Sequence, residues 1–183
     1  SFPEHAESAR VLTKSDEELF ALNEFERVIE VSKQILERNP PVDRGYQRTA
    51  ATLLAHSLFD RQRYVEAEAA YLRAKSYLAA NDPDRPAIEE RIAASIYKQA
   101  EAKRSAGDAV GAVDDFLRVS ALAPTSKVRA NAEFDAAGIL IQNKEWDRAA
   151  QVLEGFRRAY PNHELMPEVT RNLAVAYLET HEK

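Results

Sequence analysis

Few side chains in this sequence have the type and spacing that metal binding would require. The 183 residues include four histidines and no cysteine. His56 and Asp60 are four residues apart, a spacing that places two possible metal ligands on one face of a helix. The remaining histidines are dispersed along the chain. We therefore interpret His56 and Asp60 as a surface pair and expect neither a metal site nor a bound cofactor.

Two other patterns are typical of active sites, and both have a simpler structural interpretation. The segment Gly107–Gly111 lacks the Lys-Ser/Thr ending of a phosphate-binding loop and is expected to be a turn into a helix. Adjacent acids, Glu89-Glu90 and Asp114-Asp115, could support acid-base catalysis. Neighbours on a helix point about 100 degrees apart, however, so we interpret these pairs as solvated faces. No catalytic residue is assigned, and the chain is not expected to be an enzyme.

The composition favours helices and excludes several kinds of partner. Alanine, the best helix former, occurs 31 times and glycine only 5 times, which predicts an all-α fold. Asp and Glu (30) outnumber Lys and Arg (25), so the chain lacks the basic charge that binds nucleic acid. The longest apolar run is about the length of Ala174–Leu178, far below the roughly 20 residues that span a bilayer, so direct membrane insertion is not expected.

A repeat of 37 residues organises the C-terminal half of the sequence. Small, apolar and proline residues recur at this spacing, and each copy is typical of a turn followed by an amphipathic helix that ends before proline. The matching sets are Ala100, Ala137 and Ala174; Ala112 and Ala149; Phe116 and Leu153; and Pro124 and Pro161.

Earlier copies are spaced differently. Ala55 precedes Ala100 by 45 residues, and the eight additional residues fit a proline-containing loop at 81–86. A more divergent copy extends from Asn23 to Pro40. The periodicity predicts helices at 5–21, 24–38, 44–61, 64–80, 86–105, 109–122, 126–142, 146–159 and 165–180.

This pattern resembles the tetratricopeptide repeat family, whose unit is a helix-turn-helix of about 34 residues with small residues at its eighth and twentieth positions. Alanine occupies both positions here, at Ala55, Ala100, Ala137 and Ala174 and at Ala67, Ala112 and Ala149. The tryptophan usual at the fourth position is absent. The resemblance implies an α-α superhelix, a solenoid of antiparallel helix pairs that forms a single domain over 1–183. Its four and a half repeats would be 5–40, 44–80, 86–124, 126–161 and a partial unit at 165–183.

In this family the first helices of successive repeats line a concave groove that binds a peptide or a partner protein. The residues that the resemblance sends into the groove are Thr52, His56, Phe59, Tyr97, Glu101, Arg104, Asn131, Phe134, Gln142 and Arg171. For Phe59, Tyr97 and Phe134, the alternative is packing against neighbouring helices. The Lys and Asn with which some members clamp a chaperone's C-terminal carboxylate are missing, which disfavours that partner.

The resemblance therefore implies a non-enzymatic scaffold for protein–protein interaction. The alternative is a structural module that self-associates as a homo-oligomer or spaces other domains of a longer assembly protein. The Tyr160-Pro161 turn is similar to that of bacterial cell-envelope members, which implies a segment of a larger bacterial protein in the periplasm or cell envelope, with the cytoplasm as the alternative. We also expect the array to continue, leaving the face with Leu173 and Tyr177 partly uncovered.

Overall fold

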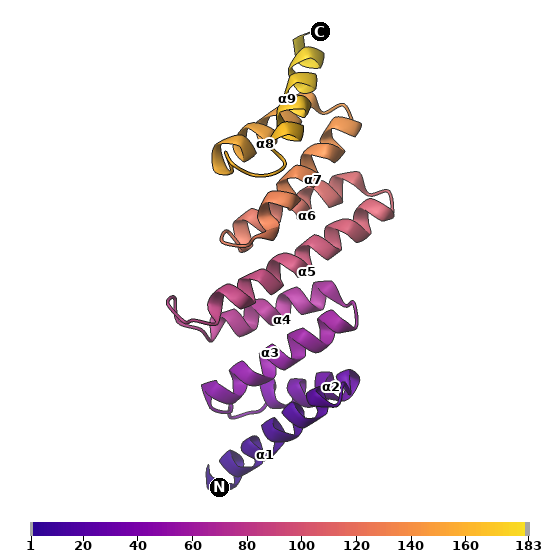
Figure 1. The fold of residues 1–183 in the computed structure, drawn as a ribbon. Helices are drawn as coiled ribbons and strands as arrows, with labels where there is room; N and C mark the ends of the chain where they lie inside the picture. Colours follow the sequence, from indigo (N-terminus) through magenta and orange to yellow (C-terminus); the bar gives the residue numbers. More distant parts are fainter. Residues whose placement is uncertain (1, 182–183) are drawn as a thin grey trace. The chain divides into compact units, whose positions relative to one another are not determined.

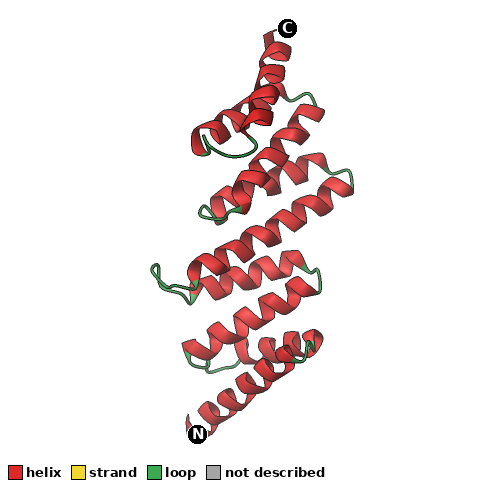
Figure 2. Ribbon diagram, in the orientation of Figure 1, coloured by secondary structure: helices red, strands yellow, loops and turns green. Residues whose placement is uncertain are grey.

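The computed structural model describes residues 2–181 and contains only helices and loops over that range, which confirms the all-α fold (Figures 1 and 2). The helices are α1 (Phe2–Ala21), α2 (Phe25–Leu36), α3 (Arg44–Asp60), α4 (Tyr64–Ser76), α5 (Arg85–Ser105), α6 (Ala109–Leu122), α7 (Val128–Gln142), α8 (Trp146–Ala159) and α9 (Met166–His181). The end of α4 differs most from its predicted position, since this helix stops at Ser76 instead of residue 80. Over the same range, none of the helices combines the length and apolarity needed to span a bilayer.

The chain folds as two compact units that divide within α5. Unit 1 ends at Ser95 and unit 2 begins at Ile96. In unit 1, each helix from α1 to α4 packs against the next one, and α1 also contacts α3. Unit 2 repeats this pattern from α6 to α9, with α7 contacting α9. Contacts between the first helices of successive pairs are typical of a repeat solenoid, so the predicted helix pairs are confirmed within each unit. The single domain of four and a half repeats stays a prediction.

The turns inside four helix pairs share one backbone geometry. Each has a residue with positive φ two positions before the second helix, and the next amide N–H donates to the carbonyl five residues earlier. The positive-φ residues are Asn23 (58°), Gln62 (60°), Gly107 (82°) and Lys144 (60°). The amide bonds join Glu24 to Leu19, Arg63 to Leu58, Asp108 to Lys103 and Glu145 to Leu140, at 2.8–3.0 Å. This is a Schellman-type helix end, and it shows that the divergent first pair has the same construction as the others.

Small residues allow the helices of these pairs to approach closely. All six alanines that the repeat register predicts at helix contacts are fully buried, with an exposed fraction of 0%. They are Ala55, Ala67, Ala100, Ala112, Ala137 and Ala149. Ala174 occupies the equivalent position on α9 and is exposed. Alanine therefore occupies the eighth repeat position both where that position is buried, as in Ala137, and where it is exposed, as in Ala174.

We expect Ala137→Leu to lower the free energy of unfolding by about 1–3 kcal/mol, because three extra carbon atoms have no room at a close helix contact. Urea denaturation followed by circular dichroism measures the change. Ala174→Leu is the matched control, since the same substitution on the exposed side of α9 meets solvent. Equal midpoints for the two variants would contradict the repeat register.

Candidate partner-binding surface

His56, which α3 presents in unit 1, is held by contacts inside the protein. Its Nδ1 lies 2.7 Å from the hydroxyl oxygen of Tyr71, and its ring centroid is 6.0 Å from that of Phe20. Burial, assisted by the positive charge of Arg91, lowers the pKa of His56. Among the side chains that the structure describes, those of residues 4–180, there is no group of three or more His, Asp or Glu arranged for a metal ion. The structure thus gives His56 a packing and hydrogen-bonding role.

Thr52 and Phe59 are half-buried and lie on the same helix. The Thr52 hydroxyl donates to the Arg48 carbonyl oxygen at 2.9 Å, within the helix itself. The Phe59 ring meets the Tyr64 ring edge-on at a centroid distance of 5.1 Å, and the Arg91 guanidinium lies 5.8 Å from its centroid. Phe59 therefore packs against its neighbours, as the alternative interpretation predicted, while part of its ring stays accessible.

Tyr97, Glu101 and Arg104 lie on the part of α5 that belongs to unit 2, and two of them bind Asp135 on α7. The Tyr97 hydroxyl donates to Asp135 Oδ2. Arg104 Nη1 lies 3.6 Å from Asp135 Oδ1, and its Nη2 is 4.0 Å from Glu101 Oε1. Glu101 also accepts Lys98 Nζ at 2.7 Å. A polar network thus joins the first helices of two successive pairs.

The Phe116 ring on α6 packs against two members of this network, Tyr97 and Arg104. It is fully buried, with the Tyr97 ring centroid at 5.0 Å and the Arg104 guanidinium carbon at 5.6 Å from its own centroid. Burial and the bond to Asp135 raise the pKa of Tyr97, so its hydroxyl remains a neutral donor. We call Tyr97, Glu101, Arg104 and Asp135 the Tyr97 surface. Asp135 is not among the groove residues predicted from the sequence, although it directly follows Phe134, which is.

The other predicted groove residues of unit 2 are divided between solvent and core. Asn131, Gln142 and Arg171 are exposed, and Arg171 pairs with the nearby Glu168, at 3.7 Å. Phe134 packs against the hydrophobic cluster of this unit, with its ring centroid 6.5 Å from that of Phe156. Phe134 and Tyr97 therefore contact different buried rings. The polar network at Tyr97 is the organised feature of this surface.

The interpretation of both acid pairs as solvated faces is wrong for one member of each pair. Glu89 is 8% exposed and lies 2.8 Å from Lys75 Nζ, while Asp115 is 6% exposed and lies 2.7 Å from Lys103 Nζ. Because adjacent helical residues point in different directions, one acid of each pair faces the neighbouring helix. Both buried carboxylates join helices through ion pairs.

The segment Gly107–Gly111 forms the predicted turn into α6. Asp108 Oδ1 accepts the Gly111 N–H at 2.9 Å, a side-chain cap on the first turn of the helix. This contact accounts for Gly111, because a Cβ at that position would lie 2.2 Å from the Asp108 carboxylate.

Comparison with known proteins identifies one repeat directly. Residues 132–163, which span α7 and α8, match the tetratricopeptide repeat family and confirm the predicted resemblance on that segment. No curated protein matches the chain. Two similar solved structures are the MamA protein (TM-score 0.47, 15% identity, 96% of this chain and 84% of that chain) and a putative kinesin light chain from Podosopora anserina with nearly identical TPR-like repeats (TM-score 0.42, 15% identity, 98% and 90%).

Proposed function

We propose that this chain, which carries a tetratricopeptide repeat match at residues 132–163, is a protein-interaction scaffold without catalytic activity. The Tyr97 surface is the part of unit 2 that contacts a peptide or a partner helix. The observation that supports this proposal is the network between α5 and α7, in which accessible side chains are already held in place by one another. A surface ordered before binding loses less conformational entropy when the partner docks.

The chemistry of the Tyr97 surface suits protein recognition. Tyrosine and arginine dominate the binding energy of many interfaces, because each combines a large apolar area with directed hydrogen-bond donors. The Arg104 side chain is 44% exposed and lies over the Phe116 ring, so its donors remain open to a partner while its plane is supported. Carbonyl and carboxylate groups of a bound peptide are the acceptors that such donors select.

We expect Arg104→Ala to weaken binding of a partner peptide by about 1–3 kcal/mol, because both the donors and the supported apolar area are lost. The peptide is first selected from a random phage-displayed library against the intact chain, and its affinity is then measured by isothermal titration calorimetry. Circular dichroism of each variant confirms that the fold is kept.

Arg157→Ala on α8 is the matched control. Arg157 is also exposed and also pairs with a glutamate three residues earlier, Glu154, so the substitution removes the same chemistry elsewhere in unit 2. Retained affinity in Arg157→Ala and reduced affinity in Arg104→Ala support the proposal. Equal affinities for the wild type and both variants, or no selected peptide at all, contradict it.

Self-association is the second candidate function, favoured by apolar side chains on α9. Val175 and Leu178 are 44% and 66% exposed, while Leu173 and Ala176 on the same helix are buried. Analytical ultracentrifugation over a concentration series tests this candidate, since a mass that rises with concentration indicates an oligomer.

We also propose that the protein is located in the bacterial cell envelope, as the Tyr160-Pro161 turn suggests. Fractionation of the cells that produce the protein tests this location.

A further inference from the structure

A pocket of about 320 Å³ lies in unit 1, and all of its lining residues belong to that unit. Its walls come from α3, from the last turn of α4 and the loop that follows it, and from the beginning of α5. Apolar side chains form most of the lining, of which Ala74, Leu78 and Ile88 are buried and Leu53 and Ala87 are more exposed. A volume at the lower end of the range for ligand sites suits one large side chain better than a nucleotide or an extended cofactor.

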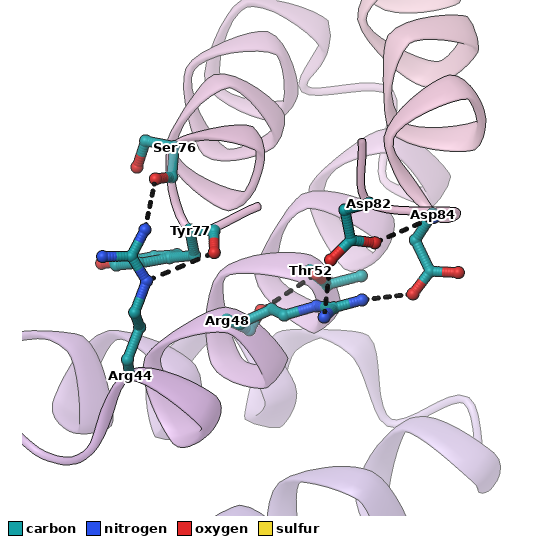
Figure 3. A network of polar contacts seen from close by, with 7 residues as sticks. All are labelled: Arg44, Arg48, Thr52, Ser76, Tyr77, Asp82 and Asp84. Atoms are coloured by element: carbon teal, nitrogen blue, oxygen red, sulfur yellow. Dashed lines mark hydrogen bonds and ion pairs between the residues drawn. The ribbon is translucent and has the colours of Figure 1, made fainter. Parts of the chain in front are cut away.

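Arg48 lines this pocket and binds two acids of the loop between α4 and α5, Asp82 and Asp84 (Figure 3). Its Nη1 lies 3.4 Å from Asp82 Oδ2, and its Nη2 donates to Asp84 Oδ2. The other oxygen of Asp82 accepts the Asp84 backbone N–H at 2.9 Å, which fixes the turn of the loop. The loop that separates this repeat from the next thus contributes Asp84 to the lining of the pocket.

A second arginine fixes the same end of α3 to α4. Arg44 donates to the carbonyl oxygens of Tyr77 at 3.3 Å and Ser76 at 3.1 Å, and its guanidinium lies 5.9 Å from the Tyr77 ring centroid (Figure 3). These carbonyls end the helix, where a cation is favourable. These contacts tie the walls to one another, so an incoming side chain meets a pocket whose shape is fixed by the protein itself.

The mouth of the pocket has an accessible negative charge. The Asp84 side chain is 64% exposed, whereas Arg48 is 38% exposed and is shared between two carboxylates. Charge complementarity thus favours a cation at the mouth over an anion. Thr49 also lines the pocket and offers a hydroxyl that can bond the backbone of a peptide.

We propose that this pocket binds a large apolar side chain of a partner peptide, and that Asp84 selects a peptide in which the next residue is Lys or Arg. The proposal rests on the scaffold function and names one of its subsites. The apolar side chain displaces water from Leu53, Leu78 and Ile88, which supplies the affinity. The ion pair to Asp84 is exposed and supplies selectivity.

Three capped dipeptides test the proposal in ¹⁵N-labelled full chain: acetyl-Phe-Arg-amide, acetyl-Phe-Glu-amide and acetyl-Ala-Arg-amide. Phe-Arg is expected to bind about two- to fivefold more tightly than Phe-Glu and about tenfold more tightly than Ala-Arg, from the shifts of amide signals during titration. The largest shifts are expected at Leu53, Leu78, Ala87 and Ile88.

Two substitutions separate the apolar and the charged contributions. Ala87→Leu fills the mouth of the pocket and should abolish Phe-Arg binding, while Ala102→Leu, on an exposed position of the same helix, should not change it. Asp84→Asn should remove the preference for Phe-Arg over Phe-Glu. Thermal midpoints establish that each variant is folded.

Three results would overturn the inference: equal or tighter binding of Phe-Glu, shifts that lie outside the pocket, or unchanged binding in Ala87→Leu. The proposal that the chain is a scaffold can be refuted independently of the pocket proposal. If a library-selected peptide depends on Arg104 while the dipeptides do not enter the pocket, only the pocket proposal is wrong.

Discussion

Phe116→Ala is expected to lower the free energy of unfolding by about 3–5 kcal/mol, because it removes a fully buried ring and leaves a cavity beneath α5. The substitution should also disturb the Tyr97 surface, since the Tyr97 ring and the Arg104 guanidinium both lie against the Phe116 ring. Urea denaturation measures the stability change. A weaker affinity for the selected peptide should accompany it at low denaturant, where the variant remains folded.

Phe59→Ala is the control for this prediction. Phe59 is half-buried and belongs to unit 1, so its removal costs less contact area and should leave the Tyr97 surface unchanged. If Phe116→Ala and Phe59→Ala lowered stability equally and neither changed peptide binding, Phe116 would not support the surface as described.

Asp16→Asn is expected to raise the free energy of unfolding at pH 7.5 by up to about 3 kcal/mol. Asp16 on α1 is fully buried, and its Oδ2 accepts the Ser32 hydroxyl of α2 at 2.5 Å. Its Oδ1 is also buried and accepts no hydrogen bond from the described residues. Burial raises the pKa of Asp16 from 3.8 to about 6, so near neutral pH the protein holds an incompletely bonded buried carboxylate. Asparagine keeps an acceptor for Ser32 without the charge.

The stability difference between Asp16→Asn and the wild type is expected to depend on pH. The folded chain binds the Asp16 proton more tightly than the unfolded chain, so the stability from this proton is complete below about pH 3.8 and is lost as the pH rises through 6. The advantage of Asp16→Asn should therefore shrink towards zero near pH 4. Glu18→Gln, an exposed acid on the same helix, should show no such change. An advantage of equal size at pH 4 and pH 7.5 would contradict the assignment.

The helices and their register could be predicted from the sequence because their causes are local and repeated. Alanine at a fixed spacing marks close helix contacts, and proline marks helix ends. The shared turn was less visible, since only Gly107 among its four positive-φ residues is a glycine. Asn23 is a residue type that tolerates this conformation, whereas at Gln62 and Lys144 the helix-end hydrogen bonds impose it on residues that rarely adopt it.

The polar contacts that organise the surfaces could not be predicted in the same way. Asp16 bonds a residue 16 positions away, and Tyr97 bonds Asp135 across 38 positions. Such pairs depend on how neighbouring helices face one another, which the periodicity of a single helix does not determine. The pocket beside Arg48 likewise depends on the path of the loop to Asp84, of which the sequence indicated only the length.

Chemical-shift mapping of a library-selected peptide on the ¹⁵N-labelled chain tests most directly whether the first helices form the binding surface. We predict that the largest amide shifts fall on α5 and α7 around Tyr97, Arg104 and Asp135, and that they disappear in Arg104→Ala. Largest shifts on the exposed faces of α6 and α8, unchanged in Arg104→Ala, would contradict the proposed scaffold surface.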